Sequence, residues 1–152
     1  MRLVLPRGRL FESAVEVLTR AGINFRKPDG RELIIKNKKH ELLLAKPFDV
    51  PLYVEKGSDI GITGRDVVEE RDCDVLVPVT LPFGKCRLSI AVPENKNFTV
   101  EDLEGKTVAT EYPGIAENYF REKGLDVEIL MVDGSTELAP IAGIADAIID
   151  IV

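Results

Sequence analysis

The sequence has 152 residues, of which 45% are hydrophobic and 30% charged, and a formal net charge of −6 at pH 7. This composition is typical of a globular protein with one domain or two small lobes, and the acidic balance argues against nucleic acid as a main partner because phosphate neutralisation requires a basic face. No apolar run approaches the roughly 18 residues of a membrane span, and residues 1–10 lack the apolar core of a signal peptide, so we expect a cytoplasmic protein without membrane contact.

Cysteine and histidine contribute little to the predicted chemistry. Cys73 and Cys86 match no metal-ligand spacing and are too few for a disulfide framework. The single histidine, His40, lies in the charged run KNKKHE, which is typical of a solvated turn or an edge strand. Histidine-based catalysis and a zinc site are therefore not expected.

The first half of the chain is predicted to alternate between strands and helices. A strand at residues 3–5 precedes a turn and a helix whose apolar residues recur on one face, and Gly22 ends that helix. Two short strands, ELIIK and ELLLAK, flank a basic turn. A second helix is expected in FDVPLYVEKG, with Asp49 as a candidate cap and Pro51 in its first turn. The strand SDIGITG and the helix RDVVEE follow.

The second half repeats this order. It contains the strand KTVAT, a turn and helix in EYPGIAENYFREKG, the strand DVEILMV, a short helix in DGSTELAPIAG that Ser135 caps, and the closing strand ADAIIDIV. In both halves the third strand opens with an acid, Asp59 or Asp146. Between the halves, residues 75–79 and 86–92 are expected to form strands, and Thr99 with Asp102 is expected to cap a helical turn.

Alternating strands and helices predict a parallel α/β sheet in each half. We therefore expect an α/β protein of two lobes, residues 1–90 with the crossing strands and residues 91–152, with a ligand cleft at the carboxyl ends of the strands. By analogy with TGRD after the strand DIGI, the closing strand should be followed by a glycine turn and a helix. We expect a fragment of a longer protein; the alternative is a complete short protein whose apolar face another chain covers.

Candidate binding residues occur at two turns of the first half. Arg7 and Arg9 flank Gly8 where a strand gives way to a helix, although the helix dipole disfavours cations at that end. The two arginines therefore indicate a bound anion, held by backbone N–H groups and a guanidinium fork; two solvated arginines are the alternative. Gly61 indicates that another group approaches the strand backbone closely, and Thr63 fits either a ligand-facing or a purely structural turn.

Three stretches of the second half carry further candidates. Tyr112 lies at a strand-to-helix junction, where its ring is suited to stacking on a flat ligand or to packing in the core. Ser135 and Glu137 lie at a helix start, where a hydroxyl favours an anion or serves as an ordinary cap. Asp150 lies at the end of the closing strand, where a carboxylate binds ribose hydroxyls or Mg²⁺, or is simply solvated. These patterns predict an anion-binding cleft without naming a ligand.

Four stretches taken together resemble one family: LPRGRL, DIGITGRDVV, FGKCRLSIAVP and DGSTELAPIAGIADAIIDIV. They are similar to the catalytic domain of ATP phosphoribosyltransferase, the first enzyme of histidine biosynthesis, over nearly the whole chain. The resemblance implies a two-lobed fold like that of type II periplasmic binding proteins. It also implies an incomplete second lobe, because the family continues after DIV into a Thr-Gly loop that cradles the donor's 5′-phosphate. Little or no turnover is then expected from the 152 residues alone.

The implied reaction transfers a phosphoribosyl group from phosphoribosyl pyrophosphate to N1 of ATP, with Mg²⁺ bound to the substrate, and releases pyrophosphate. A homo-oligomer is implied, with a separate regulatory subunit if the parent is a short form. By resemblance, Arg9 meets substrate phosphate, and Glu137 and Asp150 lie by the donor ribose and Mg²⁺; these three are the expected catalytic residues. The residues expected to face the nucleotide are Asp59, Thr63, Arg87, Ser89 and Tyr112, and the remaining substrate-binding candidates are Arg7, Gly61, Gly134 and Ser135.

Two other functions stay open. The same two-lobed fold serves proteins that bind a small anion without any chemistry, although the lack of a secretion signal counts against this. The chain is alternatively a non-catalytic fragment or partner subunit.

Overall fold

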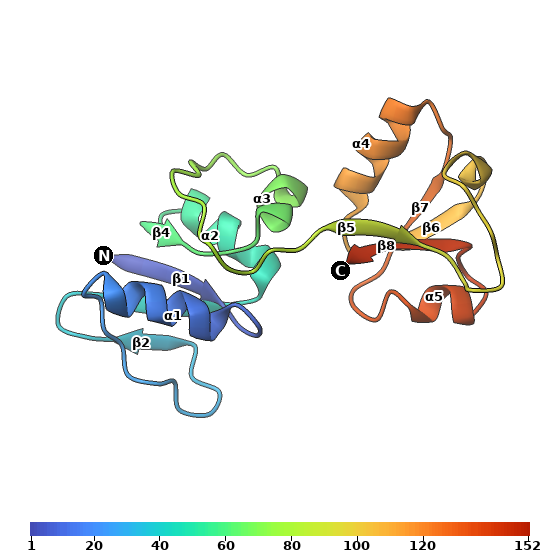
Figure 1. Ribbon diagram of the computed structural model, residues 1–152. Helices are drawn as coiled ribbons and strands as arrows, with labels where there is room; N and C mark the ends of the chain where they lie inside the picture. The colour runs from blue at the N-terminus through green and yellow to red at the C-terminus, as the bar shows by residue number, and fades with distance from the viewer. The chain divides into compact units, whose positions relative to one another are not determined.

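The computed structural model describes residues 1–152, which form two compact units, Met1–Gly84 and Lys85–Val152 (Figure 1). The lobe boundary expected after residue 90 stays a prediction. No helix in the structure has the length and apolar character needed to cross a membrane.

The first unit is built on a four-stranded sheet in the order β2-β3-β1-β4. Its strands are β1 (Arg2–Pro6), β2 (Ile34–Lys36), β3 (Glu41–Ala45) and β4 (Ile60–Gly61). β1 runs parallel to β3 and β4, whereas β2 is antiparallel to β3. Because β1 is buried from Leu3 to Pro6, it has the character of a central strand covered on both faces.

Helices cover both faces of this sheet. They are α1 (Phe11–Arg20), η1 (Pro47–Asp49), α2 (Val50–Glu55) and α3 (Arg65–Arg71). Leu3 and Leu5 of β1 share a hydrophobic core with Ala14 and Leu18 of α1. Successive side chains of a strand point to opposite faces, so Val4 points to the other face, and α2 contacts both β1 and β4.

The second unit contains a four-stranded sheet in the order β5-β8-β6-β7. Its elements are β5 (Leu88–Ala91), η2 (Glu101–Leu103), β6 (Thr107–Thr110), α4 (Pro113–Lys123), β7 (Glu128–Met131), α5 (Leu138–Ile141) and β8 (Ala147–Ile151). β6 is parallel to β7 and β8, and β5 is antiparallel to β8. Val108 and Ile149 of the sheet share a core with Ala116 and Phe120 of α4.

The two units repeat one topology. Each runs strand, helix, strand, helix, strand, as β1-α1-β3-α2-β4 and as β6-α4-β7-α5-β8, and in each the first strand lies between the second and the third. The predicted α/β repeat is therefore confirmed. The expectation of purely parallel sheets is wrong at one edge of each sheet, since β2 and β5 are antiparallel. The four residues between β2 and β3 are too few for a parallel crossover.

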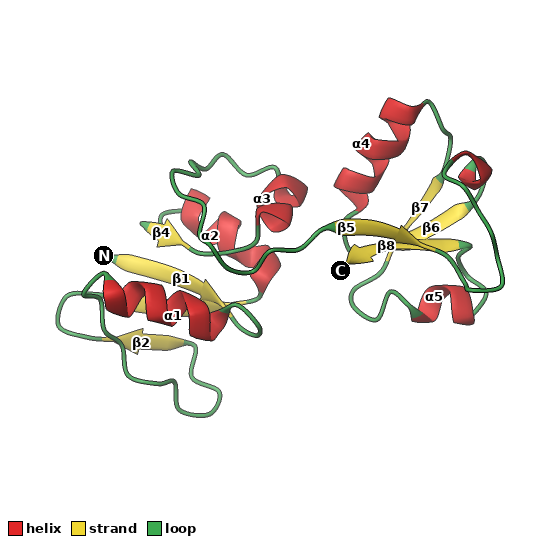
Figure 2. Cartoon of the chain, viewed as in Figure 1, coloured by secondary structure: helices red, strands yellow, loops and turns green.

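The strand expected at residues 75–79 is absent, and Figure 2 shows this stretch as loop between α3 and β5. Leu76 and Val79 are 94% and 67% exposed. An apolar, β-branched run favours a strand, but a strand also requires a neighbour for its backbone N–H and C=O groups, and no segment of this chain pairs with it. The second expected strand is confirmed in shortened form as β5.

The local caps differ from the expected ones in two places. Ser135 lies in a left-handed conformation (φ +50°), and the residue that precedes α5 is Glu137. Asp49 precedes α2 but makes no capping hydrogen bond, and its carboxylate lies 3.4 Å from Arg71 Nη2. The predicted pair of Thr99 and Asp102 is confirmed, because Asp102 Oδ2 accepts hydrogen bonds from the Thr99 N–H and hydroxyl, each at 2.8 Å.

Candidate functional site

The carboxyl edge of the first sheet carries the turn from β1 into α1. β1, β3 and β4 run parallel, so their carboxyl ends meet at this edge. The Arg7 N–H donates to the Ala45 carbonyl at 2.9 Å, which continues the pairing of β1 with β3. Gly8 then turns the chain at φ +100°, a conformation that favours glycine, and its carbonyl accepts from the Phe11 N–H. Arg9 is left exposed beside a helix start without a side-chain cap.

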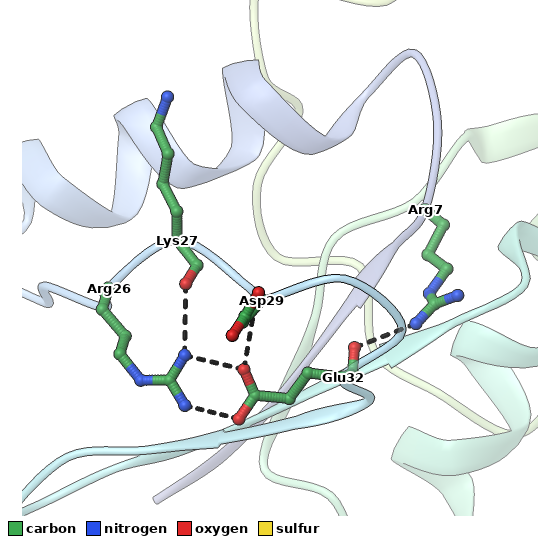
Figure 3. Close-up of polar contacts among 5 residues, drawn as sticks. All are labelled: Arg7, Arg26, Lys27, Asp29 and Glu32. Carbon is green, nitrogen blue, oxygen red and sulfur yellow. Dashed lines mark hydrogen bonds and ion pairs between the residues drawn. The ribbon is translucent and has the colours of Figure 1, made fainter.

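The Arg7 side chain points from this turn to the loop between α1 and β2 (Figure 3). Its Nη2 atom donates to the carbonyls of Glu32 at 2.9 Å and Arg31 at 3.3 Å. The Glu32 carboxylate in turn pairs with both terminal nitrogens of Arg26 and accepts from the Asp29 N–H at 3.2 Å. The hydrogen bond from Arg26, followed by that from Asp29, holds the pKa of Glu32 below its ordinary value.

Gly61 is the last residue of β4, and Thr63 follows it at the same edge. A β-carbon at Gly61 would come within 2.8 Å of methyl carbons of both Val50 and Val54, so the group that approaches this backbone is the side of α2. The Thr63 hydroxyl donates to the Pro47 carbonyl at 3.3 Å. Arg7 and Arg9 thus follow the end of β1, and Gly61 and Thr63 lie at the end of β4 or just after it. Their roles toward a ligand stay predictions.

Asp59 lies at the opposite, amino edge of the sheet. Its Oδ2 atom accepts from the Arg2 N–H at 2.6 Å, and its own N–H donates to the Arg2 carbonyl at 2.9 Å. Asp146 makes the same pair of contacts with Thr107 in the second unit, at 3.3 and 2.8 Å. Asp59 therefore joins the start of β4 to the start of β1. Its expected contact with a nucleotide stays a prediction.

The carboxyl edge of the second sheet gathers residues from three neighbouring strands. In the register of β5 with β8, Ser89 lies opposite Asp150, and the backbones of Arg87 and Val152 exchange two hydrogen bonds at 3.0 and 2.9 Å just beyond the strands. Asp150 is half-buried, and its Oδ1 atom accepts from the Ile151 N–H at 2.7 Å. One carboxylate oxygen is therefore held by the backbone.

Thr110 is a buried residue at the same strand-to-helix junction as Tyr112, and the sequence pattern gave it no role toward a ligand. Its hydroxyl donates to the Ile149 carbonyl at 2.8 Å and accepts from the Tyr112 N–H at 3.0 Å. It thereby ties the end of β6 to β8 next to Asp150 and positions the turn into α4. Tyr112 itself is only 3% exposed, so most of its ring surface is already covered by protein.

The loop between β7 and α5 completes the edge. Gly134 and Ser135 both have positive φ, +83° and +50°, and both are exposed together with Glu137. A β-carbon at Gly134 would lie 3.6 Å from Glu111 Oε1, so this loop borders the turn that follows β6. Glu111 was not predicted as a residue of this edge, although its position directly after a buried strand could have indicated it. Arg87, Ser89, Tyr112, Gly134, Ser135, Glu137 and Asp150 hence all belong to one edge of the second unit.

The fold places the chain in a known structural class. It matches the solved structure of a cysteine-binding protein from Campylobacter jejuni with a TM-score of 0.51 and 24% identity, over 75% of this chain and 47% of that one. This likeness concerns the fold alone. The protein is thus an α/β protein of the type II periplasmic-binding-protein-like class.

More specific matches define the family. The family model HisG, ATP phosphoribosyltransferase, matches residues 46–152. The ATP phosphoribosyltransferase of Pyrococcus furiosus is 55% identical over 152 residues, which are 100% of this chain and 74% of the relative. The ATP phosphoribosyl transferase (HisG:HisZ) complex from Thermotoga maritima matches with a TM-score of 0.85 and 33% identity, over 100% of this chain and 74% of that one. The chain therefore belongs to the ATP phosphoribosyltransferase family, a family of glycosyltransferases that act in the first step of histidine biosynthesis.

Proposed function

We propose that the protein transfers the phosphoribosyl group of phosphoribosyl pyrophosphate to N1 of ATP, giving N1-(5-phosphoribosyl)-ATP and pyrophosphate. The observation that carries this proposal is the collection of Ser89, Tyr112, Glu137 and Asp150 at one sheet edge in a chain 55% identical to a named ATP phosphoribosyltransferase. Open α/β sheets bind ligands at this edge.

The chemistry requires no protein nucleophile. The adenine N1 lone pair attacks the anomeric carbon, the bond from that carbon to the pyrophosphate oxygen breaks, and the electron pair leaves with pyrophosphate. The protein's task is to align two polyanions and to stabilise the leaving charge. We assign phosphate binding to Arg9 and the adjoining turn, and the ribose hydroxyls to the carboxylates of Asp150 and Glu137.

A Mg²⁺ ion fits the second edge as a substrate-bound ion. No group of three or more His, Cys, Asp or Glu side chains is gathered in the structure to hold a metal by protein ligands alone. Mg²⁺ is commonly held by substrate phosphates and by one or two carboxylates, which Asp150 and Glu137 supply. The metal, when bound, adds positive charge beside the departing pyrophosphate.

We further propose that the chain works in the cytoplasm as part of an oligomer. The structural relative from Thermotoga maritima is a complex of HisG with HisZ, which supports assembly with a regulatory subunit if the parent protein is a short form. The homo-oligomer rests on the family resemblance.

Release of pyrophosphate tests the proposed function. The 152-residue chain, and the same chain extended by the C-terminal region of the Pyrococcus furiosus relative, are each incubated with ATP, the donor and Mg²⁺. We expect release from the extended protein, and a comparison with the 152-residue chain shows whether the added region is required. Binding of ATP and donor without release from either protein would favour a small-anion binding protein.

The variant Asp150→Asn tests the assignment at the second edge. We expect kcat/KM to fall by about 10–10³-fold, the scale of removing a single polar interaction with the transition state, in the protein that releases pyrophosphate. The exposed Asp126→Asn is the matched control and should leave kcat/KM within about twofold. Unchanged kinetics in Asp150→Asn would remove Asp150 from the site.

A further inference from the structure

Residues 26–32, in the loop between α1 and β2, are folded around one carboxylate. Glu32 accepts hydrogen bonds from two nitrogens of Arg26 and from the Asp29 N–H at 3.2 Å, and the Glu32 N–H donates to the Asp29 carbonyl at 3.0 Å. Arg26 Nη1 also donates to the Lys27 carbonyl at 3.2 Å. Figure 3 shows these contacts closing the loop on itself. The side chain of Glu32 therefore determines where the carbonyls of Arg31 and Glu32 lie.

Those two carbonyls are the partners of Arg7. Only its Nη2 atom donates to them, and Nε and Nη1 donate to no protein acceptor in the structure. A guanidinium is planar, so fixing one nitrogen restricts the orientation of the other two donors. The loop thus holds one nitrogen of the Arg7 guanidinium, and the other two nitrogens have no protein acceptor. Arg7 lies two residues before Arg9 in the chain.

We propose that Glu32 is a positioning residue, which orients Arg7 so that its open nitrogens meet a phosphate group at the carboxyl edge of the first sheet. This inference rests on the proposed function, which places substrate phosphates at this edge. The side chains of Arg26 and Glu32 are 57% and 25% exposed, and an exposed ion pair adds little to stability by itself. Its effect is therefore expected in phosphate binding, because a polar group binds well only when its own orientation is held.

Glu32→Gln tests the positioning role, because glutamine keeps the size of the side chain and cannot form the ion pair with Arg26. The probe is inorganic pyrophosphate, titrated into the 152-residue chain and followed by calorimetry. We expect the dissociation constant to rise about fivefold. The variant Glu41→Gln is the matched control, because Glu41 is similarly exposed and pairs with Arg2 and Lys36 at the opposite edge, and it should leave the dissociation constant unchanged.

Arg7→Met provides the decisive background. If Glu32 acts through Arg7, Glu32→Gln has no additional effect on pyrophosphate binding in the Arg7→Met protein. An equal fivefold weakening in both backgrounds, or the same weakening in Glu41→Gln, overturns the inference. Arg26→Lys, which keeps the charge, should restore part of the affinity that Arg26→Met removes.

A readout without ligand separates this inference from the proposed function. NMR of the free protein measures the motion of the Arg7 side-chain N–H groups. Their motion should be restricted in the wild type and should increase in Glu32→Gln. Unaltered Arg7 signals overturn the inference whether or not the protein is an enzyme. Failure of the extended protein to release pyrophosphate overturns the proposed function and leaves the comparison of Arg7 signals intact.

Discussion

Asp59 and Asp146 occupy the same place in the two repeats and make the same pair of contacts. Each aspartate accepts from the N–H, and donates to the carbonyl, of the first residue of the central strand, Arg2 or Thr107. The acids that open the third strands were visible in the sequence, but their partners lie 57 and 39 residues away. Only the sheet register brings them together, so a local pattern could not predict the contact.

The first prediction at the residue scale is that this contact stabilises each unit. Asp146→Ala removes the acceptor for the Thr107 N–H, and we expect the free energy of unfolding of the second unit to fall by about 1 kcal/mol. Asp59→Ala should do the same to the first unit, whereas Asp74→Ala at an exposed loop position should be neutral. Urea unfolding measures all three. Wild-type stability in both Asp59→Ala and Asp146→Ala would show that these hydrogen bonds contribute nothing.

Gly61 illustrates how one residue controls the packing of an element. The expectation that another group approaches the Gly61 backbone closely is confirmed. The approaching groups belong to α2, since Val50 and Val54 fill the space where a side chain at Gly61 would lie. Helix α2 therefore packs closely against β4. A pattern in the sequence shows that a strand glycine is unusual, yet it does not say whether a ligand or a helix lies above it.

Gly61→Ala tests this packing of α2. The added methyl group would lie 2.8 Å from two valine methyls, and overpacking of this kind costs about 1–3 kcal/mol. We expect the melting temperature to fall, and Gly61→Ala combined with Val54→Ala to recover part of the decrease, because Val54 is only half-buried. A Gly61→Ala protein that melts at or above the wild-type temperature would contradict this account.

At the scale of elements, the sequence predicted most strands and helices because their signals are local. Helix α4 ends at Lys123, and Gly124 follows in the left-handed conformation, as the sequence indicated. The prediction of a strand at residues 75–79 was wrong because strand formation depends on a neighbouring strand as well as on apolar side chains. The antiparallel edges at β2 and β5 were missed because pairing direction depends on topology rather than on composition.

At the scale of the whole molecule, each unit brings its predicted residues to the carboxyl edge of its own sheet, with Asp59 as the exception at the amino edge. The sequence allowed this grouping to be foreseen because parallel strands end at the same edge and the candidates follow strands. Glu111 and the structural role of Thr110 were missed, since the hydroxyl that joins β6 to β8 has no distinctive neighbouring pattern. The cleft expected between two lobes stays a prediction.

The central claim is that the protein transfers a phosphoribosyl group to N1 of ATP, and the identity of the product tests it most directly. Mass spectrometry of the nucleotides formed from ATP and the donor, by the protein that releases pyrophosphate, should show ATP increased by one phosphoribosyl group. That product should form at least about 10-fold more slowly with Asp150→Asn and with Arg9→Met. Pyrophosphate formed together with AMP, and without the phosphoribosyl adduct, would contradict the claim.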